Sequence, residues 1–146
     1  MSVKLHINGQ EIHAQEGQTI LEAAKDNGYH IPTLCYHKDL CIAGNCRVCL
    51  VEVEGDHRLQ ASCVMPVMPM MKVKTNSAKA VRARKKAVEL LLAEHVGECY
   101  TCARNNDCEL QDLAYEMNVI DLPFKKRTEG KFEKETTASI IRDNDK

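Results

Sequence analysis

Several features that define common protein classes are missing from this sequence of 146 residues. It has no Trp, and aromatic residues make up only 4% of it, which argues against a large self-sufficient hydrophobic core. The formal net charge is −1, so charge indicates neither a nucleic acid partner nor a membrane surface. The apolar runs are too short for membrane insertion, and the N-terminus lacks the apolar segment of a secretory signal. We therefore expect a cytoplasmic protein.

Cysteine is what the sequence has in excess, with eight residues that fall in two groups. In a cytoplasmic chain, clustered cysteines more often bind metal or carry out redox chemistry than form disulfides. The chain length allows one ordinary domain or two small ones. A metal centre could then supply the stability that a small core does not.

Residues 1–76 have the pattern of a small α+β unit. Asn8-Gly9 is a strong hairpin signal between two alternating segments, and Thr19 and Glu22 form a capping box for a short helix that ends before Gly28. Five strands are predicted, at residues 3–7, 11–14, 48–53, 59–64 and 72–74. A long loop without periodicity covers residues 35–46.

Residues 77–122 are predicted to form a second, helical unit. Ser77 is suited to cap a long helix that runs to about His95, and Gly97 is suited to end it. A cysteine-containing loop follows, and a second amphipathic helix begins near Asp107. Residues 123–146 are expected to form a charged, extended tail or linker.

The first group of cysteines has the spacing C-x10-C-x2-C-x13-C, at Cys35, Cys46, Cys49 and Cys63. Four thiolates suit either a zinc ion or an iron–sulfur cluster. Cys41 is an alternative first ligand, because with the next two cysteines it forms the plant-type ferredoxin run C-x4-C-x2-C. That run favours an iron–sulfur cluster whichever cysteine comes first.

The second group begins with a histidine, in the spacing H-x3-C-x2-C-x5-C at His95, Cys99, Cys102 and Cys108. A lone histidine at the end of an amphipathic helix is usually part of the core. The three cysteines that follow favour a metal ligand instead. Structural zinc is the alternative to an iron–sulfur cluster here too.

The segments that hold these groups, LCYHKDLCIAGNCRVCLVEVEG and HVGECYTCARNNDCELQDLAYEMNV, resemble a known family. They are similar to the N-terminal iron–sulfur region of the large peripheral-arm subunit of complex I. FeFe hydrogenases of the NAD(P)-linked type and NAD-linked formate dehydrogenases share this region. In longer members, a stretch resembling SIIRDNDK leads into further cluster motifs, so a sequence that ends at Lys146 is expected to be a trimmed piece or a short subunit.

The resemblance implies an α+β fold: a β-grasp 2Fe–2S ferredoxin domain followed by a small helical 4Fe–4S domain. It implies that the first cluster is held by four cysteines, Cys35, Cys46, Cys49 and Cys63, with Cys41 as an additional thiol. The implied ligands of the second cluster are one histidine and three cysteines, His95, Cys99, Cys102 and Cys108.

We expect the chain to relay single electrons, with an FeFe hydrogenase as the first candidate for the parent enzyme. A complex I or formate dehydrogenase subunit is the alternative. The sequence has no G-x-G-x-x-G motif and no P-loop, so flavin and NAD(P) sites are expected on partner domains or subunits, as are further iron–sulfur clusters. No catalytic residues are predicted. The rival from another class is a zinc-stabilised interaction module without redox chemistry.

Overall fold

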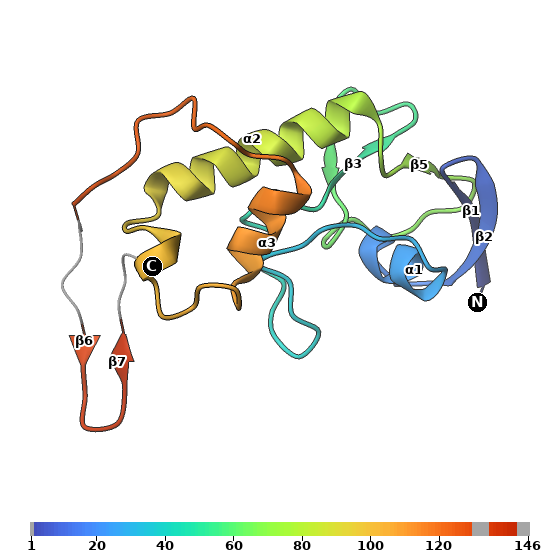
Figure 1. Cartoon of the computed structure of the whole chain (residues 1–146). Helices are drawn as coiled ribbons and strands as arrows, with labels where there is room; N and C mark the ends of the chain where they lie inside the picture. The colour runs from blue at the N-terminus through green and yellow to red at the C-terminus, as the bar shows by residue number, and fades with distance from the viewer. Residues whose placement is uncertain (1, 130–134, 143–146) are drawn as a thin grey trace. The chain divides into compact units, whose positions relative to one another are not determined.

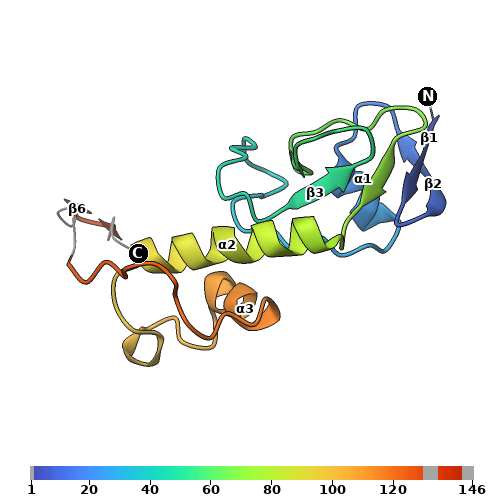
Figure 2. The same ribbon diagram turned by 90° about the horizontal axis from the view of Figure 1, so that it is seen from above.

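The structure is a computed structural model that describes residues 2–129 and 135–142 (Figure 1). The chain forms two compact units, Met1–Ala87 and Val88–Lys146. The boundary between them falls within the helix α2 (Ala78–Glu94), which Figure 2 shows from above. The domain boundary expected at residue 76 lies just before this helix.

The first unit is a five-stranded sheet with one helix. Its elements are β1 (Ser2–Ile7), β2 (Gln10–Gln15), α1 (Ile20–Asp26), β3 (Leu50–Val53), β4 (Gln60–Ala61) and β5 (Lys72–Lys74). The strand order is β2-β1-β5-β3-β4, and β1 and β5 are parallel while the other pairs are antiparallel. Asn8 and Gly9 have φ angles of 51° and 86°, so the predicted two-residue hairpin turn is confirmed.

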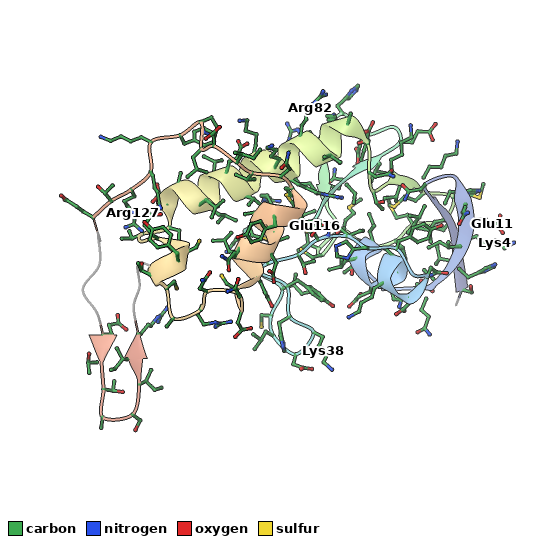
Figure 3. All side chains as sticks on the ribbon, in the orientation of Figure 1. Lys4, Glu11, Lys38, Arg82, Glu116 and Arg127 are labelled. Atoms are coloured by element: carbon green, nitrogen blue, oxygen red, sulfur yellow. The ribbon has the colours of Figure 1, made fainter. Side chains whose placement is uncertain are left out.

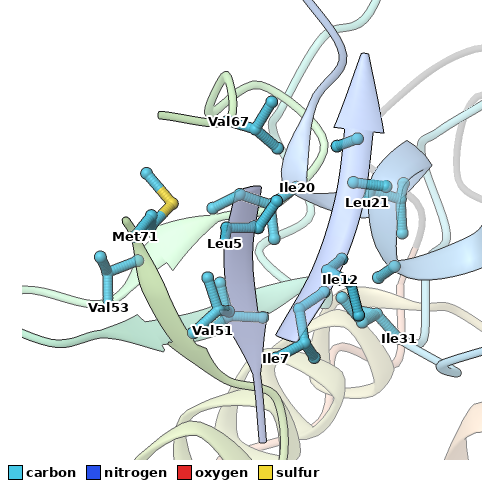
Figure 4. Close-up of a cluster of buried hydrophobic side chains, with 14 of the residues drawn as sticks. Leu5, Ile7, Ile12, Ile20, Leu21, Ile31, Val51, Val53, Val67 and Met71 are labelled. Carbon is cyan, nitrogen blue, oxygen red and sulfur yellow. The ribbon is translucent and has the colours of Figure 1, made fainter. Parts of the chain in front are cut away.

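The helix α1 begins with the predicted capping box: the Thr19 side chain accepts from the backbone of Glu22, and the Glu22 side chain accepts from the backbone of Thr19. Ile20 and Leu21 point from this helix into the core, where Leu5 and Ile7 of β1 are fully buried (Figure 4). This apolar cluster gives the cysteine-bearing loops a rigid base.

Two predicted strands are shorter than expected. β3 begins at Leu50, and β4 has only two residues, so Cys63 lies in a turn and not on a returning strand. The reason is that the backbone N–H groups of Val64 and Met65 both donate to the Ala61 carbonyl at 3.1 Å, which closes a turn directly after β4.

The second unit contains the end of α2, a short 3-10 helix η1 (Cys99–Thr101), α3 (Glu109–Glu116) and a hairpin of β6 (Glu135–Thr136) and β7 (Ile141–Arg142). Ser77 caps α2 as predicted, since its hydroxyl accepts from the Ala80 N–H at 3.2 Å. This hairpin lies within residues 123–146, which are expected to form the extended tail. No helix in the described part of the chain is long and apolar enough to span a membrane.

Candidate metal centres

Two of the predicted ligands in the first unit lie in the interior beside the sheet. Cys49 and Cys63 are 2% and 1% exposed. Ser62, which is fully buried, joins their segments: its hydroxyl donates to the Cys49 carbonyl at 2.8 Å, and its N–H donates to the same oxygen at 3.2 Å. The first N–H groups of α1 hold the same turn, since Ile20 donates to the Met65 carbonyl and Leu21 to the Ser62 carbonyl.

The other two cysteines of this group lie on the long loop. Burial raises the pKa of the Cys35 thiol, but hydrogen bonds from Cys46 and from the backbone of Asn45 outweigh this effect and leave the pKa below its ordinary value. The pKa of Cys46 is raised, mainly by burial. Each of the two thiols therefore influences the pKa of the other.

The pKa of Cys63 depends on the other three thiols of the first group. Burial, a hydrogen bond with Cys49 and the charges of Cys49, Cys35 and Cys46 raise the pKa of Cys63 from 9.0 to about 12. Cys63 is thus influenced by each of the other three predicted ligands. Cys41 is exposed and is not one of the groups that shift these pKa values.

The predicted ligands of the second unit line one small pocket together. His95, Cys99, Cys102 and Cys108 all border it, and Arg104, Asn105 and Gln111 complete its wall. Each ligand stands at the end of an element: His95 follows α2, Cys99 opens η1, Cys102 follows η1, and Cys108 is the N-cap of α3. The backbone N–H of Arg104 donates to the Cys102 sulfur at 3.4 Å.

Sequence reasoning missed Gln111, which is 7% exposed and organises the loop between Cys102 and Cys108. Its side-chain oxygen accepts from the Asn106 N–H at 2.8 Å, and its nitrogen donates to the Asn105 side chain at 2.9 Å. The signal in the sequence is a polar residue three positions after a ligand, on a helix whose apolar positions are Leu110, Leu113 and Ala114.

Tyr36, next to Cys35, was missed as well. Its pKa is raised by burial, by the charge of Glu22, by a hydrogen bond with Glu22 and by the charge of Cys63. The phenol therefore lies between the capping box of α1 and the first group of thiols.

Among the described residues, no three His, Cys, Asp or Glu side chains are close enough to hold a single metal ion.

Comparisons with known proteins match the two cysteine groups to two separate regions of the chain. Residues 1–78, more than half of it, match the family described as "2Fe-2S iron-sulfur cluster binding domain". Residues 84–122 match the "NADH-ubiquinone oxidoreductase-G iron-sulfur binding region". The two cofactors predicted from the sequence, a 2Fe–2S and a 4Fe–4S cluster, are thereby confirmed.

The chain is similar to the NADP-reducing hydrogenase subunit HndD of Solidesulfovibrio fructosivorans, with 45% identity over 145 residues, 96% of this chain and 25% of that protein. It is also similar to the NADH-ubiquinone oxidoreductase 75 kDa subunit of Reclinomonas americana, with 45% identity over 76% of this chain and 16% of that protein. The crystal structure of a NAD+-reducing [NiFe]-hydrogenase shares 36% identity, with a TM-score of 0.83, over 90% of this chain and 56% of that one.

The chain thus spans a quarter or less of the length of these curated relatives. The resemblance inferred from the cysteine segments is confirmed, since hydrogenase and complex I subunits both match. The fold is mixed α/β, and its two cysteine groups fall one in each matched region. The chain belongs to the family of 2Fe–2S iron–sulfur cluster binding domains and continues into the 4Fe–4S region shared by NAD(P)-linked hydrogenases and NADH dehydrogenases.

Proposed function

We propose that this chain relays single electrons between a donor and an acceptor within an NAD(P)-linked oxidoreductase. In this proposal the first unit is a β-grasp domain whose 2Fe–2S ligands are Cys35, Cys46, Cys49 and Cys63, and the 4Fe–4S ligands of the second unit are His95, Cys99, Cys102 and Cys108. When bound, the two clusters supply reversible one-electron chemistry.

The influence of three thiols on the pKa of Cys63, together with the burial of Cys49 and Cys63, is the observation that supports the first ligand set. The other three thiols raise the pKa of Cys63, and Cys46 lowers the pKa of Cys35. Nearby backbone N–H groups lower the pKa of both Cys35 and Cys46, and such donors stabilise thiolate. The site therefore fits a cluster held by four thiolates, and exposed Cys41 is left as an additional thiol.

The shared pocket supports the second ligand set in the same way. One imidazole and three thiols border it, and this donor set suits a cluster that carries one fewer negative charge than an all-cysteine equivalent. A less negative centre accepts an electron more readily, so histidine should raise the potential. His95 must stay deprotonated at its ligating nitrogen, and ligation should therefore weaken in acid.

The second ring nitrogen of a ligating histidine needs a backbone or carboxylate acceptor, and Glu94, Glu98 and Asp112 are the candidates near His95 in the sequence. Two of these carboxylates form ion pairs elsewhere. The Glu94 carboxylate lies 3.5 Å from the Arg127 guanidinium, and the Glu98 carboxylate lies 2.9 Å from the Lys126 ammonium. Asp112, the third candidate, is exposed on α3.

A hydrogenase is the better candidate for the parent enzyme. HndD matches 96% of this chain, whereas the complex I relatives match 75% to 77% of it. Within the hydrogenases, the sequence resemblance favours the FeFe type, whereas the solved relative is of the NiFe type. Partner domains or subunits would supply the flavin, the NAD(P) site and further clusters in a cytoplasmic assembly. A complex I or formate dehydrogenase subunit is the second candidate.

Anaerobic reconstitution of the full chain with iron and sulfide tests this proposal. We expect roughly six iron atoms per chain, two from one cluster and four from the other, and two EPR signals after reduction with dithionite. Cys35→Ser should abolish only the 2Fe–2S signal, and His95→Ala should abolish or strongly perturb only the 4Fe–4S signal. A colourless protein with stoichiometric zinc would instead support the zinc-stabilised interaction module.

A further inference from the structure

The loop from His95 to Cys99 is held from outside by two consecutive cations, Lys126 and Arg127. Neither belongs to the 4Fe–4S region that matched over residues 84–122. Arg127 lies beside the C-terminal end of α2 (Figure 3). All of these residues are in the second unit.

Arg127 acts on the last turn of α2, which ends one residue before His95. Its Nε and Nη2 donate to the Glu94 carbonyl at 2.9 and 2.7 Å, and its backbone N–H donates to the Ala93 carbonyl at 2.7 Å. The last turn of α2 has no basic residue of its own, so this guanidinium provides the positive charge that helix C-termini favour. Its side chain is only 16% exposed.

Lys126 acts on the other side of the histidine. Its ammonium donates to the Gly97 carbonyl at 2.7 Å and to the Glu98 carboxylate at 2.9 Å. Glu98 directly precedes Cys99, and Lys126 borders a cavity of about 290 Å³ together with His95 and Cys99. Two adjacent side chains therefore fix both ends of the His95–Cys99 segment.

We propose that Lys126 and Arg127 form a clamp that positions His95 and Cys99 for the 4Fe–4S cluster. This inference rests on the proposed ligand role of His95. Gly97, with φ of 101°, sits between the two ligands and gives the segment freedom that nothing in the ligand spacing restrains. The clamp removes that freedom by binding the Glu94 and Gly97 carbonyls on the two sides of the histidine.

Arg127→Ala in the full chain tests the clamp, because the main-chain bond to Ala93 remains and only the side-chain contacts are lost. Lys125→Ala is the matched control, since it removes the same charge from an exposed neighbouring position. In the cluster-free chain, amide exchange over residues 93–99 should be roughly tenfold faster in Arg127→Ala than in wild type or in the control.

In the reconstituted chain, Arg127→Ala should lose the 4Fe–4S cluster to a chelator roughly tenfold faster than wild type, while loss of the 2Fe–2S cluster is unchanged. The nitrogen hyperfine coupling of the histidine ligand should change in the reduced 4Fe–4S signal, and Arg127→Lys should restore it in part. Lys126→Ala should change amide exchange, 4Fe–4S loss and hyperfine coupling in the same direction. This variant provides the test if Arg127→Ala does not fold.

If Arg127→Ala and Lys126→Ala match Lys125→Ala in exchange, cluster loss and hyperfine coupling, the clamp is refuted. A wild-type chain without a 4Fe–4S signal would refute the proposed function instead. The exchange experiment on the cluster-free chain would still decide whether the two cations restrain the loop.

Discussion

Replacing Ser62 by Ala should weaken the connection between two proposed ligands of the first cluster. The Ser62 hydroxyl donates to the Cys49 carbonyl at 2.8 Å inside the core, and Ser62 directly precedes Cys63. The substitution removes this bond, but the Cys49 carbonyl keeps the Ser62 N–H at 3.2 Å and is not left unsatisfied. The loss in the free energy of unfolding should therefore be about 1 kcal/mol, the ordinary value for one hydrogen bond.

Ser77→Ala is the matched control because it makes the same chemical change at the N-cap of α2. It removes the bond from the Ala80 N–H and should cost about 1 kcal/mol as well, but Ser77 is not bonded to a ligand segment. Urea unfolding of both cluster-free variants should confirm that their stabilities are lowered alike. In the reconstituted chains, Ser62→Ala should lose the 2Fe–2S cluster to a chelator roughly fivefold faster than Ser77→Ala.

Equal rates of 2Fe–2S loss in the two variants would refute the reasoning. Ser62 would then contribute to the stability of the first unit in general and not to the placement of Cys49 and Cys63.

Three further predictions concern the proposed ligands. His95→Cys should keep a 4Fe–4S cluster with a lower midpoint potential, because a thiolate adds negative charge. A redox titration followed by EPR measures the midpoint potential, and an unchanged or higher value would contradict this prediction. Cys41→Ser should retain the 2Fe–2S absorption spectrum that Cys35→Ser loses, and the opposite result would make Cys41 the ligand. In the reduced cluster-free chain, the pKa of Cys63 is raised from 9.0 to about 12. The unfolded chain therefore releases this proton at a lower pH than the folded chain does. The free energy of unfolding should fall as the pH rises from 9.0 to about 12. Urea unfolding at about pH 7 and about pH 10 should show a smaller fall for Cys63→Ala than for wild type.

Local signals in the sequence predicted much of the fold correctly. Asn8-Gly9, the Thr19 capping box and the Ser77 cap each depend on a few adjacent residues, and each forms as expected. The second helix also begins close to Asp107 as predicted, with Cys108 as its N-cap, because its start follows from the apolar pattern after it. Such features need no knowledge of the rest of the chain.

Features that depend on distant partners were not predictable in this way. Cys63 was expected on a strand, but the turn that carries it is held by N–H groups of α1, some forty residues earlier in the chain. Lys126 resembled any lysine of a charged tail, and only the folded chain brings its ammonium to the Gly97 carbonyl. The spacing of the cysteines therefore indicated the candidate ligands without indicating which residues hold them in place.

Residues with a positive φ angle are a further feature that the spacing of the ligands does not predict. Gly44, Arg47, Gly97 and Asn106 all have φ between 59° and 101°, and each lies between two proposed ligands of one site. Left-handed residues in such short segments turn consecutive N–H groups toward one side, where they can donate to sulfur. Glycine does this without strain, but the conformation of Arg47 costs roughly 1–2 kcal/mol. Because the neighbouring Val48 and Cys49 are buried, the packing of the first unit can hold Arg47 in this state, and its backbone is thus set by the core and not by its own side chain.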